Sequence, residues 1–158
     1  MNRKPTLAAR VAALEARFAM IAATRMAGVP LLNERLAVAA VGFEPVEGDE
    51  GGAVGVLLTP WFMNLLWLPG DEAQAAAPGA SRRRAVGREN FEFIGALEEC
   101  IGPYEACSLF SPMFEFEDQA AALATAREVL TQLRRPPEPQ PQASRRALLF
   151  GRTASRPR

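Results

Sequence analysis

The segment TPWFMNLLWLPGD, Thr59 to Asp71, packs two tryptophans, a phenylalanine and a methionine into one run with a proline near each end. The part from Phe62 to Leu68 predicts a strand that ends at Pro69-Gly70-Asp71. Period-2 alternation places one set on a common face: Trp61, Met63, Leu65 and Trp67. The opposite face holds Phe62, Asn64 and Leu66. Both faces are largely apolar, which suits a core strand and a partner-binding surface equally.

A second apolar region follows in two pieces, NFEFIG (Asn90–Gly95) and YEACSLFSPMFEFEDQAA (Tyr104–Ala122). Phe91 and Phe93 share a face with Glu92 opposite, which predicts a half-buried strand. Met113 follows Pro112 at a bend, where we expect it to be partly exposed. The aromatic, sulfur-containing and acidic residues of the two regions are therefore candidates for core or for contact with a partner.

Two amphipathic helices flank these regions. The first is predicted from Leu7 to about Met26, with Thr6 as its N-cap and an apolar stripe of Leu7, Val11, Leu14, Phe18 and Ile21. The second runs from Gln119 to about Arg134, with Asp118 as its N-cap and apolar residues Leu123, Ala126, Leu130 and Leu133.

Short strands are predicted between the helices, at 36–43, 53–59, 62–68, 82–86, 91–94 and 106–110. The order helix, antiparallel strands, helix predicts an α+β fold. We expect a two-layer domain over residues 1–135, a mainly antiparallel sheet with both helices packed on one face. Residues 136–158, rich in proline and arginine, are expected to be a disordered tail that carries five arginines against one glutamate.

The composition excludes several classes of function. The chain has no histidine, which removes the commonest general base and metal ligand, so we expect neither an enzyme nor a resident cofactor or metal. Acidic and basic residues balance at 18 each, which gives no indication of nucleic-acid binding. The longest apolar run is interrupted by Thr59, Pro60 and Asn64, so no membrane span is expected. With two cysteines and no export signal, we expect a cytoplasmic protein with reduced thiols.

The two cysteines, Cys100 and Cys107, have neither the spacing of a redox CxxC motif nor that of a zinc knuckle. One interpretation is that both are structural. The alternative is a thiol-based metal-handling or redox site, which Glu98 or Glu99 would have to complete. The run Arg82-Arg83-Arg84 is interpreted as a solvated surface.

Six motifs in this order resemble the HybE-type assembly chaperones of [NiFe] hydrogenases, a family that includes the HupJ and HoxT proteins. The motifs are RMAGVPLLN (25–33), VGF (41–43), TPWFMNL (59–65), LPG (68–70), FEFIG (91–95) and CSLFSPMFEF (107–116). The likeness runs from about residue 14 to 134, and the tail departs from the family's core pattern. The paired CxxC motifs of the rubredoxin linked to some relatives are absent, so iron and electron transfer are not carried over.

The resemblance implies an accessory factor that binds precursors of the small or large subunit of a membrane-bound uptake [NiFe] hydrogenase. It further implies that this binding delays export of the precursor until the metal centres are assembled. One candidate for the segment that the factor recognises is the twin-arginine signal of the small subunit. The acidic and apolar residues suit such a basic and apolar signal. The residues expected to contact the partner are Trp61, Phe62, Met63, Asn64, Trp67, Glu92, Phe110, Met113 and Glu115.

Overall fold

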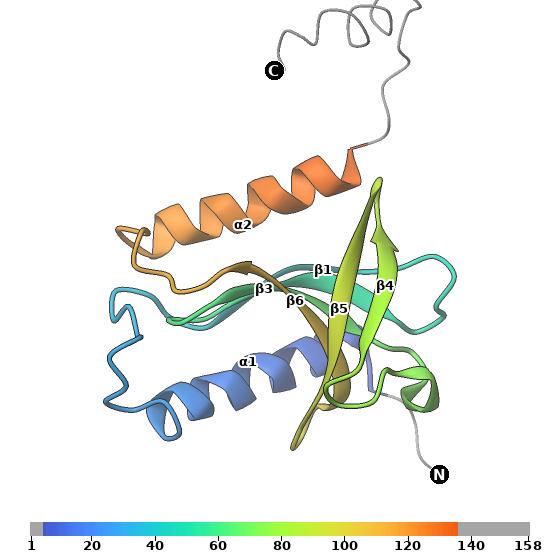
Figure 1. Cartoon of the computed structure of the whole chain (residues 1–158), viewed down its shortest axis with the longest axis horizontal. Helices are drawn as coiled ribbons and strands as arrows, with labels where there is room; N and C mark the ends of the chain where they lie inside the picture. Colours follow the sequence, from blue (N-terminus) through green and yellow to red (C-terminus); the bar gives the residue numbers. More distant parts are fainter. Residues whose placement is uncertain (1–4, 136–158) are drawn as a thin grey trace, which may run out of the picture.

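The computed structural model describes residues 5–135, which form a six-stranded antiparallel sheet with one helix on each face (Figure 1). The elements in chain order are α1 (Leu7–Ala23), β1 (Ala39–Pro45), β2 (Ala53–Leu58), β3 (Met63–Leu68), a short 3-10 helix η1 (Glu72–Gln74), β4 (Ser81–Val86), β5 (Glu89–Glu98), β6 (Gly102–Phe110) and α2 (Gln119–Arg134). The predicted α+β class, with an antiparallel sheet and two terminal helices, is confirmed. The predicted tail at 136–158 lies outside the described residues.

The sheet consists of two three-stranded meanders. Strands β1, β2 and β3 form the first, β4, β5 and β6 form the second, and pairing of β3 with β6 joins them in the order β1-β2-β3-β6-β5-β4. The two middle strands of the sheet are therefore β3 and β6. This arrangement explains why β3 is apolar on both faces, since it lies under cover on each side.

The two helices cover opposite faces of the sheet, which corrects the expectation that both would share one face (Figure 1). Helix α1 packs Leu14, Phe18 and Ile21 against one face, on Leu57, Leu66, Leu68 and Tyr104. Helix α2 packs Ala122, Ala126, Leu130 and Leu133 against the other, on Val56, Leu65, Trp67 and Phe93. Successive residues of β2 and β3 alternate between the two clusters, so each central strand contributes to both cores. The domain therefore has three layers.

Both helices begin at the predicted caps. The Thr6 hydroxyl accepts a hydrogen bond from the Ala9 N–H at 3.1 Å, and the Asp118 carboxylate accepts one from Ala121 N–H at 2.8 Å. Such caps satisfy amide groups that the first helical turn leaves unpaired. Neither helix within residues 5–135 is long and apolar enough to cross a membrane.

A buried ion pair joins the edge strand β4 to the middle strand β6. Arg84 donates to both carboxylate oxygens of Glu105, at 2.6 and 3.0 Å, and its guanidinium lies 4.3 Å from the centroid of the Trp67 ring. Glu105 is fully buried and also accepts a hydrogen bond from the Ala76 N–H at 2.9 Å. The interpretation of the arginine run as solvated is therefore wrong for Arg84, whose partner lies in β6.

Strand β5 diverges from β6 along half of its length. It pairs with β4 along all of β4, but its ladder with β6 begins only at Ile94, opposite Ala106. The β4–β5 hairpin rises toward the end of α2, as Figure 1 shows, and a Cβ added at Gly87 in its turn would overlap the Leu133 carbonyl oxygen. The sheet therefore opens between the first half of β5 and the last residues of β6.

Candidate functional site

Asn33 joins three segments that are distant in the sequence. Its backbone N–H donates to the Pro60 carbonyl at 2.8 Å, and its side-chain amide donates to the carbonyls of Met113 and Phe116 at 2.9 and 3.0 Å. Its side-chain oxygen accepts the Arg35 N–H at 3.1 Å. Asn33 is buried, so these bonds satisfy an amide that would otherwise be costly to remove from water. One residue thus connects the α1–β1 loop, the β2–β3 turn and the β6–α2 loop.

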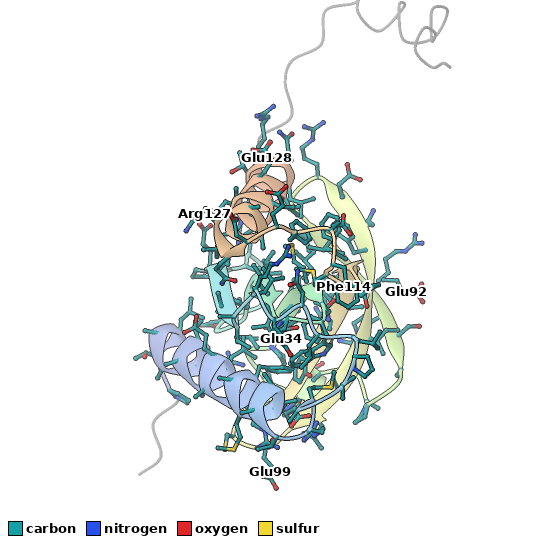
Figure 2. All side chains as sticks on the ribbon, turned by 90° about the vertical axis from the view of Figure 1, so that its left-hand side faces the viewer. Glu34, Glu92, Glu99, Phe114, Arg127 and Glu128 are labelled. Atoms are coloured by element: carbon teal, nitrogen blue, oxygen red, sulfur yellow. The ribbon has the colours of Figure 1, made fainter. Side chains whose placement is uncertain are left out.

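These hydrogen bonds bring two loops together at one end of the sheet. Their exposed residues form a surface, here called the end surface, made of Leu31, Glu34, Phe114, Glu115 and Glu117. Leu31 is 55% exposed and Phe114 is 53% exposed. Figure 2 views the molecule from this end and shows Glu34 and Phe114 near the centre of the face. Exposed apolar side chains mark a contact surface where they gather into a patch, and Leu31 and Phe114 come from the two loops that Asn33 joins.

The end surface is acidic. Its three glutamates form no ion pair within residues 5–135, and Arg35, which follows Glu34 in the chain, is exposed. The nearby carboxylate of Asp118 caps α2. A negative surface that includes exposed apolar side chains suits a partner segment that is both basic and apolar.

The β2–β3 turn supports this surface from within. The Thr59 hydroxyl accepts hydrogen bonds from the N–H groups of Trp61 and Phe62, at 3.2 and 2.9 Å, and closes the turn. The rings of Trp61 and Phe62 then pack around Phe18 of α1, with centroids 6.5 and 5.9 Å away. Trp61 therefore belongs to the turn, and its predicted alternation with Met63 is wrong.

The structure distributes the predicted contact residues among several environments. Met63, Trp67 and Met113 are buried, which corrects both the direct contact predicted for them and the partial exposure expected of Met113. Trp61, Phe62 and Phe110 are half-buried, and Phe110 packs edge-on against Phe116 at 5.3 Å. Asn64 is half-buried with its side-chain oxygen enclosed and unbonded within residues 5–135. Glu92 and Glu115 are exposed, and only Glu115 belongs to the end surface.

Cys100 and Cys107 do not share a site. Cys100 lies in the exposed β5–β6 turn, whereas Cys107 lies half-buried in β6. The five steps along the strand from Gly102 to Cys107 span about 16 Å, so Cys107 lies far from the turn that holds Cys100. Burial, with a smaller effect of the Glu92 charge, raises the pKa of the Cys107 thiol, so this thiol stays protonated at neutral pH. Within residues 5–135 no three cysteines or carboxylates are grouped to hold a metal ion.

A separate cleft of about 510 Å³ lies at the far end of the sheet, between the first turns of α1 and the loop after β3. Its most distinctive polar group is Arg10, which donates to the carbonyls of Gly51 and Pro69 at 3.0 and 2.9 Å. These hydrogen bonds connect the walls of the cleft, and both terminal nitrogens of the Arg10 guanidinium are used in them.

Comparison with known proteins gives consistent results. The sequence model of the family described as "[NiFe]-hydrogenase assembly, chaperone, HybE" matches residues 9–151, which extends past Arg134 into the tail that the motifs left out. The chain is 49% identical to the protein HoxT of Cupriavidus necator, over 90% of this chain and 89% of that protein. It is 43% identical to the hydrogenase expression/formation protein HupT of Azotobacter chroococcum, over 86% and 91% of the two chains.

The fold is also similar to the solution structure of HybE from Escherichia coli. The TM-score is 0.62, and the match covers 93% of this chain and 92% of that one at 24% sequence identity. At this identity the likeness shows the fold alone.

Proposed function

The chain belongs to the HybE family of [NiFe]-hydrogenase assembly chaperones, and from this membership we propose that it binds precursor subunits of a membrane-bound uptake hydrogenase. Binding delays export of the precursor until its metal centres are assembled. The observation that carries the placement of the site is the end surface, where Asn33 holds two exposed apolar side chains among three glutamates.

The partner segment is the twin-arginine signal of the small subunit. Such a signal joins a basic stretch to an apolar one, and the end surface offers carboxylates beside Leu31 and Phe114. Arginine–carboxylate bonds give orientation and specificity, while burial of an exposed phenylalanine contributes roughly 1–2 kcal/mol. Because the exposed apolar area is small, affinity is moderate, which suits a chaperone that must release its client.

The predicted contact residues take two roles in this proposal. Glu115 contacts the client directly, and Glu92 flanks the surface. Trp61, Phe62, Met63, Trp67, Phe110 and Met113 act as the packed support that keeps the loops in place. The protein needs no resident cofactor and catalyses no reaction in this role, and it works in the cytoplasm, where the signal is still attached.

The test is recovery of client from hydrogenase-expressing cells with the tagged protein, before and after cofactor insertion is blocked. Enrichment of unprocessed subunits when maturation is blocked supports the proposal and identifies the client. If neither sample contains a hydrogenase subunit, the proposal is wrong.

Cys100 lies in the β5–β6 turn and Cys107 lies well along β6, and this separation argues against a shared thiol site. We therefore expect a Cys100→Ser/Cys107→Ser double variant to recover the same precursors as the parent. Loss of recovery in this variant, with normal folding, would favour the metal-handling or redox alternative.

A further inference from the structure

The last residues of β6 form an open strand edge next to the end surface. Strand β6 continues to Phe110, but its ladder with β5 ends at the pair Ile94–Ala106. Beyond that pair, Cys107, Ser108 and Phe110 pair with β3 alone, and the register shifts at Leu109, which has no partner in that ladder. We call these four residues the open edge of β6. An interior edge of this kind is unusual, because proteins generally cover or shorten unpaired strand edges.

The direction of the backbone groups at this edge follows from the register. Gly95 donates to the Ala80 carbonyl and accepts from the Gly79 N–H, so its backbone groups face away from β6. Alternation then directs the backbone of Ile94 toward β6 and that of its partner Ala106 toward β5. Ser108 lies two residues after Ala106, so its N–H and C=O also point to the β5 side of β6. At this position β5 has already diverged and does not pair with them. Ser108 is exposed, and its C=O accepts a long contact from the Cys107 thiol at 4.0 Å, which leaves the N–H and the C=O available to an added strand.

The two sides of the open edge differ in chemistry. Toward α2 lie the partly buried apolar side chains of Phe91, Cys107 and Leu109. Toward the other face lie Ser108 and Glu92, both exposed. Glu92 forms no ion pair within residues 5–135, although Arg83 is its neighbour in the ladder with β4. A strand laid along this edge would place alternate side chains against an apolar surface and against a carboxylate.

We propose that the open edge of β6 takes an extended segment of the client as an added strand, with its apolar side chains toward Leu109 and an arginine toward Glu92. This inference rests on the proposed function and specifies how the segment is held. Main-chain hydrogen bonds to Ser108 supply affinity, and the alternation of apolar and basic side chains supplies selectivity, as in other complexes formed by strand addition. The edge continues directly into the 111–118 loop, so one segment reaches both the edge and Phe114.

The test uses a labelled synthetic peptide that carries the twin-arginine signal of a hydrogenase small subunit. Ser108→Pro removes the N–H that the added strand needs and leaves the existing ladder intact. Ala85→Pro is its matched control, since the Ala85 N–H also points away from a neighbouring strand, at the outer edge of β4. Fluorescence anisotropy should give at least fivefold weaker binding for Ser108→Pro, a change within twofold for Ala85→Pro, and weaker binding for Glu92→Gln.

Hydrogen exchange gives a second readout that does not depend on a proline variant. In the parent protein saturated with peptide, the amides of 107–110 should exchange more slowly, whereas those of 81–86 should not change. If the peptide binds but protects none of 107–110, and Ser108→Pro binds it equally well, strand addition is wrong and the proposed function stands. If the peptide does not bind the parent protein, strand addition and recognition of the twin-arginine signal are both wrong. Recovery of precursors from cells then tests the chaperone role separately.

Discussion

Removal of the Asn33 side chain should loosen the end surface by a calculable amount. Asn33→Ala deletes three hydrogen bonds, two to the carbonyls of Met113 and Phe116 and one from the Arg35 N–H. At about 1 kcal/mol each, the free energy of unfolding should fall by about 3 kcal/mol. For a domain of this size that loss lowers the melting temperature by roughly 10 °C. Urea denaturation followed by tryptophan fluorescence measures the first quantity, and thermal denaturation measures the second.

Two further variants make the test specific. Asn33→Asp keeps the shape but sets a carboxylate against two carbonyl oxygens, so it should be less stable than Asn33→Ala at neutral pH. It should recover as the pH falls, because a protonated carboxyl can donate again. Asn90→Ala removes an exposed amide and should change stability by less than about 0.5 kcal/mol. A loss below about 1 kcal/mol for Asn33→Ala would refute the claim that this residue holds the two loops.

Three other predictions concern ionisable groups. Hydrogen bonds from Arg25 and, to a smaller extent, from Arg17 lower the pKa of Glu98. Ionised Glu98 therefore stabilises the folded state at pH values above the unfolded pKa of 4.5, and this stabilisation is lost as the pH falls through the lower pKa of the folded state. Glu98→Gln should therefore destabilise the protein at pH 7 by about 1–2 kcal/mol and flatten the acid limb of its stability profile; equal acid limbs would contradict this. Burial raises the pKa of Tyr104, the single tyrosine, to about 12, so absorbance titration of the folded protein should detect tyrosinate only well above pH 10. Iodoacetamide should label exposed Cys100 faster than half-buried Cys107, and a Cys100→Ser variant that still labels fast would contradict that order.

The local elements were predictable because their signals are local. Thr6 and Asp118 each lie directly before an amphipathic run, and both cap a helix in the structure. Most of the strands follow apolar runs, with the arginine-rich β4 as the exception. The predicted positions agree with the observed ones within a few residues, except that β5 and β6 extend further. Composition and periodicity therefore predict the elements of this fold.

The relative placement of the helices could not be read from the same patterns. An apolar residue at every position of β2 shows that both faces of the strand are covered, but it does not say what covers them. The expectation that both helices share one face was wrong because each helix packs on the central strands of a different face. The β4–β5 hairpin rises toward the end of α2 and places Val86 and Phe93 in the core on that face (Figure 1).

The centre of the candidate site was missed for a different reason. Asn33 bonds to residues 80 and 83 positions away, and Arg84 pairs with a carboxylate in another strand, so no local signal distinguishes either from a surface residue. Met113 was expected to be partly exposed, whereas the loop buries Met113 and Phe116 and turns Phe114 outward. Exposure within such a loop is set by tertiary hydrogen bonds, which the sequence pattern does not contain.

Photo-crosslinking in hydrogenase-expressing cells shows whether the end surface contacts an unprocessed hydrogenase subunit. A photoreactive phenylalanine analogue is placed at Phe114 in one variant and, as a control, at Leu97 in another; Leu97 is 62% exposed and lies near the tip of the β5–β6 hairpin, outside the end surface. If the end surface binds the client, the analogue at 114 should crosslink to an unprocessed hydrogenase subunit when cofactor insertion is blocked, and the analogue at 97 should not. Crosslinking from 97 and none from 114 would contradict this role of the end surface.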